Sequence, residues 1–214
     1  VLNSLKQIAG NQDLEVKARV SASAAIFSVG KGDELREYGL NRERFEREGK
    51  YDADFHAQVL EQLAHVARFR DVRPGDGLGE LLNDLIARSE VGVKNAALSL
   101  AGIWKVEDTE DKVLEAAADK ALPVSVRSTA FETLASMGSG SAKKLLSGYG
   151  GASQAPELRA AAIRSLAGLD GEDAARQAAL LFAEADLDKL DAAPVLAAFL
   201  ERKDGSEVLA DALD

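Results

Sequence analysis

The chain has 214 residues, no cysteine, and 36 acidic against 26 basic residues, for a net charge of −10. The lack of cysteine excludes disulfides, thiolate metal sites, covalent haem attachment and cysteine nucleophiles within this chain. An acidic surface repels polyanions unless a basic stripe is segregated on it, so nucleic-acid binding is not expected. No apolar run reaches the roughly 20 residues that cross a bilayer, so we expect no membrane insertion.

Apolar residues follow a helical period along most of the chain, and one short phrase returns at nearly regular intervals. Each copy opens with a bulky apolar residue and continues into small and aliphatic residues. The copies begin, in chain order, at Val16, Phe55, Val93, Val126, Leu158 and Leu190. Their spacing of roughly 32 to 39 residues is typical of repeats made of two helices.

Between the copies lie more amphipathic segments, whose apolar residues recur at helical spacing and leave one polar face. These segments are Leu78 to Arg88, Thr109 to Lys120, Ser141 to Ser147, Gly171 to Glu184 and Ser206 to Leu213. No segment shows the two-residue alternation of a strand. The sequence therefore predicts an all-α fold, a HEAT-like superhelix of about six antiparallel helix pairs spanning residues 1–214 as a single solenoid.

Glycines and prolines punctuate this pattern. Gly30, Gly138, Gly148 and Gly168 stand where the apolar period stops, which predicts left-handed helix caps. The pattern breaks once, over residues 30–54, where the chain is dense in charge and poor in aliphatic residues. Two interpretations stay open for this charged segment: a solvated elaboration, or an insertion that docks a partner. In the second case Arg42, Arg44 and Arg47 are the candidate partner-binding residues and should project from one surface.

Three basic residues occupy the same offset of the repeat phrase: Lys94, Arg127 and Arg159. We call them the basic column. Since residues at one offset line up along stacked repeats, we expect the column to be structural and to bridge to carboxylates of the neighbouring repeat.

No catalytic or metal-binding constellation emerges from the spacing. His56 and His65 are too far apart on one helix to bind a metal together, and Glu61 with His65 is a surface pair rather than a site. Asp170 and its neighbours fit a helix cap. Trp104 is expected to pack in the core. We therefore expect no enzyme activity, cofactor or metal in this chain.

The repeats resemble HEAT repeats, through the Val-Arg phrase with downstream Ala and Leu. More specifically, three segments resemble the helical-repeat region of the large membrane-bound dehydrogenases of the planctomycete and verrucomicrobial type, which bind haem. The three segments are Arg36 to Gly75, Leu100 to Glu107 and Val195 to Leu213. In that family a propeller-like sugar-dehydrogenase domain precedes the repeats, and a cytochrome c module with a Cys-x-x-Cys-His motif follows.

The resemblance implies that this chain is a segment of a larger exported redox protein, at the periplasm or cell surface. No family active-site residue has a counterpart here. We expect a non-catalytic scaffold that docks proteins or neighbouring domains of its parent chain. Two alternatives stay open: an enzyme or prosthetic-group lyase built on HEAT-like repeats, and a haem-relay segment that contacts a cytochrome module through His56, His65 or Trp104.

Overall fold

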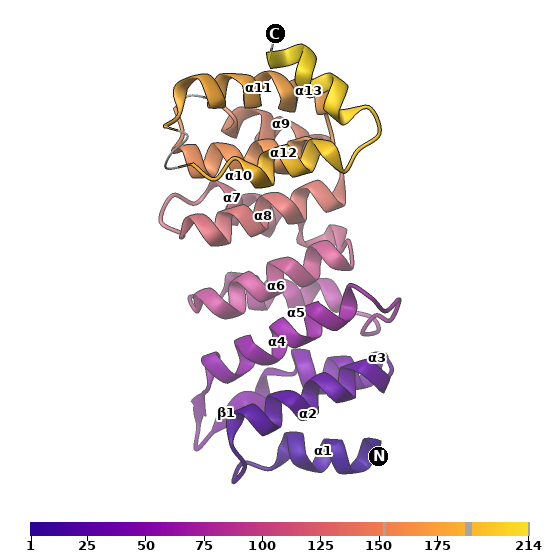
Figure 1. Ribbon diagram of the computed structural model, residues 1–214. Helices are drawn as coiled ribbons and strands as arrows, with labels where there is room; N and C mark the ends of the chain where they lie inside the picture. Colours follow the sequence, from indigo (N-terminus) through magenta and orange to yellow (C-terminus); the bar gives the residue numbers. More distant parts are fainter. Residues whose placement is uncertain (152, 187–189, 214) are drawn as a thin grey trace. The chain divides into compact units, whose positions relative to one another are not determined.

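The computed structural model describes residues 1–151, 153–186 and 190–213, and this part of the chain is almost entirely helical (Figure 1). The all-α prediction is confirmed at this level. One small exception is a hairpin of β1 (Glu46–Arg47) and β2 (Lys50–Tyr51) inside the charged segment. Contacts divide the chain into two compact units, Val1–Lys112 and Val113–Asp214, which are described separately.

In the first unit, α2, α4 and α6 pack side by side, while α1 packs on α2 and α5 packs on α6. The elements of this unit are α1 (Leu2–Gly10), α2 (Val16–Val29), α3 (Gly32–Leu35), the π-helical turn η1 (Arg36–Leu40), the 3₁₀ turn η2 (Arg42–Phe45), β1, β2, α4 (Ala53–Ala67), α5 (Leu78–Ala87), α6 (Val91–Ile103) and the 3₁₀ turn η3 (Glu107–Thr109). Asp52 caps α4, because its carboxylate accepts the Phe55 amide at 3.0 Å.

In the second unit, α8, α10 and α12 pack side by side, and α9, α11 and α13 pack against them. The helices are α7 (Glu110–Ala118), which begins just before the unit boundary, α8 (Val124–Met137), α9 (Gly140–Tyr149), α10 (Pro156–Leu166), α11 (Gly171–Glu184), α12 (Ala193–Leu200) and α13 (Gly205–Leu213). Successive helices thus form packed pairs within the unit: α8 with α9, α10 with α11, and α12 with α13.

The glycine caps agree with the sequence at only one position. Gly138 ends α8 with φ of 74°, the left-handed conformation that a glycine cap supplies. Gly30 ends α2 in an extended conformation instead, and Gly148 lies inside α9. The prediction was wrong at Gly168 too, because that residue does not have a positive φ. An interrupted apolar period shows where a helix face is no longer buried. That point need not be a helix end, and a helix can end without a left-handed residue.

The core of the second unit contains the apolar residues at matching offsets of the repeat phrase. Phe131 and Leu134 of α8 and Ile163 and Leu166 of α10 are each 0% exposed. The repeat register therefore predicted which face of these two helices is buried. Small alanines between the large residues allow α8 and α10 to approach closely.

Replacing Leu166 with alanine should lower the free energy of unfolding by about 2 to 5 kcal/mol, because a buried side chain is lost and a cavity remains. Urea denaturation followed by circular dichroism measures this change. Leu200→Ala is the matched control: Leu200 is 68% exposed, so its loss should change stability by only about 0.5 kcal/mol or less. Equal effects of the two substitutions would show that the register is wrong.

Candidate docking surfaces

The charged segment 30–54 folds back onto the first unit and is not a detached loop. It forms α3, η1, η2 and the small hairpin, and its apolar residues Leu35, Leu40 and Phe45 are only 2%, 2% and 3% exposed. Gly39 permits close packing here, because a Cβ at this position would lie 2.6 Å from a methyl carbon of Leu63 on α4. The few aliphatic residues of the segment therefore suffice to anchor it, and its charges remain at the surface.

Two of the three predicted partner-binding arginines have acidic partners within the segment. Arg42 contacts Glu46 at 3.1 Å, and Arg44 contacts Glu37 at 2.9 Å. Arg47 lies exposed on β1, with no ion pair among the residues that the structure describes. The arginines therefore differ in their freedom to meet a partner, and binding through them stays a prediction.

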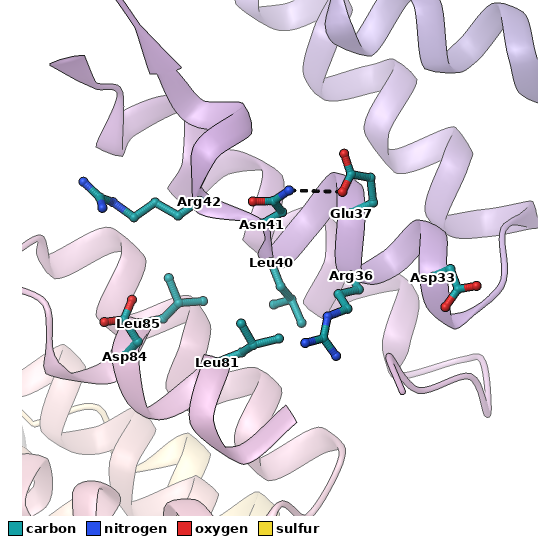
Figure 2. Close-up of a pocket in the computed structure, with 9 residues that line it drawn as sticks. All are labelled: Asp33, Arg36, Glu37, Leu40, Asn41, Arg42, Leu81, Asp84 and Leu85. Atoms are coloured by element: carbon teal, nitrogen blue, oxygen red, sulfur yellow. Dashed lines mark hydrogen bonds between the residues drawn. The ribbon is translucent and has the colours of Figure 1, made fainter. Parts of the chain in front are cut away.

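A cavity of about 530 Å³ lies between the charged segment and α5 (Figure 2). It is lined by Asp33, Arg36, Glu37, Leu40, Asn41, Arg42, Leu81, Asp84 and Leu85. Partial burial raises the pKa of Glu37, but hydrogen bonds from Asn41 and Arg44 outweigh it and leave that pKa below its ordinary value. Glu37 therefore stays ionised near neutral pH and is a poor general acid. The cavity mixes charges of both signs and defines no ligand class.

His56 joins the charged segment to α4 and is 0% exposed. Its Nε2 lies 2.9 Å from the Gly39 carbonyl oxygen and its Nδ1 lies 2.7 Å from the Tyr51 hydroxyl. Because a carbonyl can only accept, Nε2 carries the proton and Nδ1 accepts from Tyr51. The ring also stacks on Phe45, with 3.8 Å between centroids. Both nitrogens are thus used inside the protein, and burial lowers the pKa of His56 to about 4.

This buried, neutral His56 predicts a specific pH dependence of stability. Its pKa is about 4 in the folded protein against 6.5 for an exposed histidine, so the unfolded chain binds more protons between these values. Stability should therefore fall as pH is lowered from about 6.5 towards 4, by a total of about 3 kcal/mol from this residue. Urea denaturation at several pH values between 7 and 5 measures the slope.

His56→Gln is the diagnostic variant, because glutamine can still donate to the Gly39 carbonyl but does not titrate. We expect this variant to lose most of the slope above about pH 5. His65→Gln, at an exposed histidine, is the control and should keep it. A slope that is the same in both variants would remove His56 as its origin.

The basic column makes a contact that the sequence did not predict. Each member is the fourth residue of its helix and donates to a backbone carbonyl at the end of the preceding helix. The pairs are Lys94 with Ile86, Arg127 with Ala117 at 3.0 Å, and Arg159 with Gly150 at 3.1 Å. Carbonyls at a helix C-terminus lack intrahelical partners and lie at the negative end of the helix dipole. The expected carboxylate is present for Arg159, which pairs with Glu184 at 2.8 Å.

Arg19 makes the same contact, and His56 makes a related one to η1, which η2 and the hairpin separate from α4. Sequence reasoning missed both contacts. Arg19, the fourth residue of α2, donates to the Ala9 carbonyl at 3.3 Å and is 8% exposed. His56, the fourth residue of α4, donates to the Gly39 carbonyl. In the other copies that have a donor, it directly follows the first residue of the phrase. By that alignment the copy assigned to Val16 begins at Ala18, two residues later. Helix position, rather than the neighbouring apolar residue, is the signal that would have found Arg19.

Arg127→Met should cost about 1 to 3 kcal/mol of folding free energy, because the buried Ala117 carbonyl loses its donor. Arg127→Lys should restore part of that loss, since Lys94 makes the equivalent contact with an amine. Arg176→Met serves as control: Arg176 has a 63% exposed side chain, and its surface ion pair contributes little. Thermal unfolding compares the stability of the three variants. Equal destabilisation by Arg127→Met and Arg176→Met would contradict a stabilising contact at Arg127.

The end of α4 carries an exposed aromatic residue that the sequence did not single out. Phe69 is 78% exposed, and its ring meets His65 edge to face at 5.6 Å between centroids. Arg68 is exposed beside it and has no ion pair among the described residues. We call His65, Arg68 and Phe69 the Phe69 patch. An exposed ring beside an unpaired guanidinium combines two side-chain types that are enriched at protein interfaces.

The chain that follows the Phe69 patch is attached to the end of α2 by the side chain of Arg70. Arg70 donates to the carbonyls of Phe27 and Gly30, the latter at 3.0 Å. At Gly32 a Cβ would collide with the carbonyl oxygen of Arg73, so the absence of a side chain allows the loop to pack there. Phe69 therefore extends into solvent from a chain segment whose position these contacts fix.

Trp104 is 3% exposed at the end of α6 and thus buried as expected, whereas His65 belongs to the exposed Phe69 patch. Over the described ranges, no group of three or more His, Asp and Glu side chains could hold a metal ion. Within those ranges, too, no helix combines the length and the apolar character that crossing a membrane requires.

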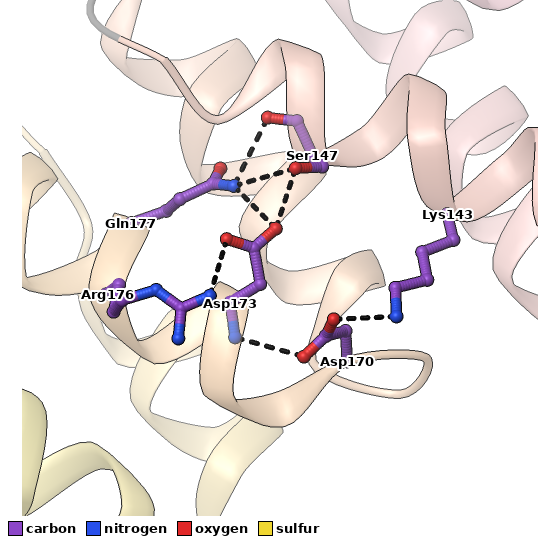
Figure 3. Close-up of polar contacts among 6 residues, drawn as sticks. All are labelled: Lys143, Ser147, Asp170, Asp173, Arg176 and Gln177. Carbon is purple, nitrogen blue, oxygen red and sulfur yellow. Dashed lines mark hydrogen bonds and ion pairs between the residues drawn. The ribbon is translucent and has the colours of Figure 1, made fainter.

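A polar cluster links α9 to α11 in the second unit (Figure 3). Asp173 accepts from Ser147 at 2.7 Å and from Gln177 at 3.0 Å. Asp170 caps α11 by accepting the Asp173 amide at 3.1 Å, as expected. The hydrogen bond from Lys143 holds the pKa of Asp170 below its ordinary value. Both carboxylates have donors within the cluster, which indicates a structural role rather than an acid–base pair.

Comparison with known proteins assigns no family to the chain: no protein-family model matches it, and no curated protein is significantly similar in sequence. The resemblance to the HEAT-repeat region of membrane-bound dehydrogenases therefore stays a prediction.

Proposed function

We propose that this chain is a HEAT-like helical-repeat scaffold that docks a protein partner or neighbouring domains of its parent chain. The observation that carries the proposal is the recurring contact from the fourth residue of a helix to the end of the preceding helix. Arg19, Lys94, Arg127 and Arg159 make it, and His56 makes a related contact to η1. A repeated contact of this kind is typical of stacked helical repeats, whose extended surfaces bind partners.

The environment of the ionisable groups supports a non-catalytic role. His56 has both ring nitrogens engaged inside the protein and is inaccessible to a substrate. Burial also raises the pKa of Tyr51 to about 12, so this hydroxyl stays protonated near neutral pH and cannot serve as a general base. No specific observation favours the lyase alternative or the haem relay, since two of the three relay candidates, His56 and Trp104, are buried.

The Phe69 patch is the docking surface that we favour in the first unit. A large ring that is 78% exposed gains apolar burial only when a partner covers it. Because the loop backbone is fixed by Arg70, binding would cost little ordering of this loop. Arg68 adds a positive charge to a chain of net charge −10, so the partner should offer an apolar pocket with an acidic rim.

Phe69→Ser should weaken binding of the modules encoded next to this chain in its parent gene by about tenfold or more, measured by calorimetry with each module expressed separately. Val29→Ser is the control, because Val29 is also exposed, at 61%, and lies on α2 of the same unit. A triple variant, Arg42→Ser, Arg44→Ser and Arg47→Ser, tests the charged segment independently. Unchanged affinity in Phe69→Ser and in the triple variant would overturn docking at both surfaces.

The parent protein is a separate question with its own test. The resemblance implies an exported redox protein in which this chain spaces or docks other domains. A Cys-x-x-Cys-His motif downstream in the same reading frame would support that parent. A reading frame without a haem motif or a propeller domain would contradict it and leave the scaffold proposal intact.

A further inference from the structure

A groove of about 530 Å³ lies on the second unit, between α7 and α9. It is lined by Leu114, Ser141, Lys144, Leu145, Gly148, Tyr149 and Gln154. Four of these residues follow the helical spacing i, i+3, i+4 and i+7 along α9 and so share one face of that helix. The groove is therefore built mainly on a single helix face, with α7 as its far wall.

Gly148 has no internal reason to be glycine. It lies inside α9, where glycine destabilises a helix by roughly 0.5 to 1 kcal/mol relative to alanine. A Cβ at this position would meet no atom of the described residues within 4 Å. The free space lies outside the unit's own packing, and the missing side chain lets another molecule approach the helix backbone beside Leu145.

The charge of the groove is opposite to that of the chain. Among the described residues no carboxylate lines it, although the chain carries a net charge of −10. Lys144 is exposed and has no ion pair among the described residues, whereas the adjacent Lys143 is held by Asp170 at 2.8 Å. Behind the wall, the Arg127 guanidinium lies 5.2 Å from the centroid of the Tyr149 ring and is itself 6% exposed. The groove thus combines apolar surface with positive charge.

We propose that this α9 groove docks an acidic, leucine-containing helix of a protein partner, with a leucine over Gly148 and Leu145 and a carboxylate on Lys144. The inference rests on the proposed function and names a second docking site and its partner chemistry. Ser141, Lys144 and Gly148 are exposed, so the groove is too open to bury most of a small ligand's surface. The apolar lining comes from Leu145 and Tyr149 of α9 and Leu114 of α7, and this open surface suits the apolar side of an amphipathic partner helix.

The probe is a short acetylated fluorescent peptide with Leu at helical i, i+3, i+4 and i+7 positions and Glu elsewhere, titrated with the whole chain by anisotropy. Lys144→Glu should weaken binding about tenfold or more, because an attractive contact becomes repulsive. Lys120→Glu is the matched control: it makes the same charge change at another exposed lysine of the second unit and should leave affinity unchanged. Gly148→Leu should block the groove while circular dichroism shows the helical content kept.

A peptide with Lys in place of Glu should bind at least tenfold more weakly than the acidic peptide. Equal binding of the two peptides, or equal affinities of Lys144→Glu and Lys120→Glu, would overturn the proposal. Saturable binding of sodium dodecanoate without binding of the acidic peptide would also overturn it, in favour of a small amphiphile. Phe69→Ser separates this inference from the proposed function. It should weaken binding of the partner modules and leave peptide binding at the α9 groove unchanged.

Discussion

One contact recurs through both units: the fourth residue of a helix donates to a carbonyl at the end of the helix before it. Arg127 and Ala117 show its simplest form, at 3.0 Å. The contact satisfies a backbone acceptor that the preceding helix leaves open, and it places a positive charge at the negative end of that helix. Because one side chain ties two helices together, it fixes how each helix follows the last within a unit.

A related contact explains how the charged segment fits the fold. At the corresponding position of α4 stands His56, which donates to Gly39 in the segment itself. A neutral imidazole can donate at one nitrogen and accept at the other, so His56 also accepts from the hydroxyl of Tyr51, which belongs to strand β2 of the hairpin. A guanidinium could not do this, since it has no acceptor. The insertion thus becomes part of the first unit's core.

The two proposed docking surfaces share one physical property: each leaves contact area that the described residues do not cover. Phe69 is exposed on a loop that Arg70 holds in place, and Gly148 leaves space over α9 that no described residue fills. By contrast, Arg42 and Arg44 have glutamate partners within their own segment. The density of charge in the sequence therefore identified a surface segment. Exposed apolar area and open space in the structure show where a partner can add contacts.

The sequence by itself determined the helical class, the repeat phrase and the buried face, as Leu134 and Leu166 show. These properties are local, because a helical period is encoded within a few turns. Only the tertiary structure decided that the basic column binds backbone carbonyls, that Arg19 belongs to the same set, and that Phe69 remains exposed. Such features depend on which helix end lies next to which side chain, and loop length and packing set that distance rather than the residue pattern.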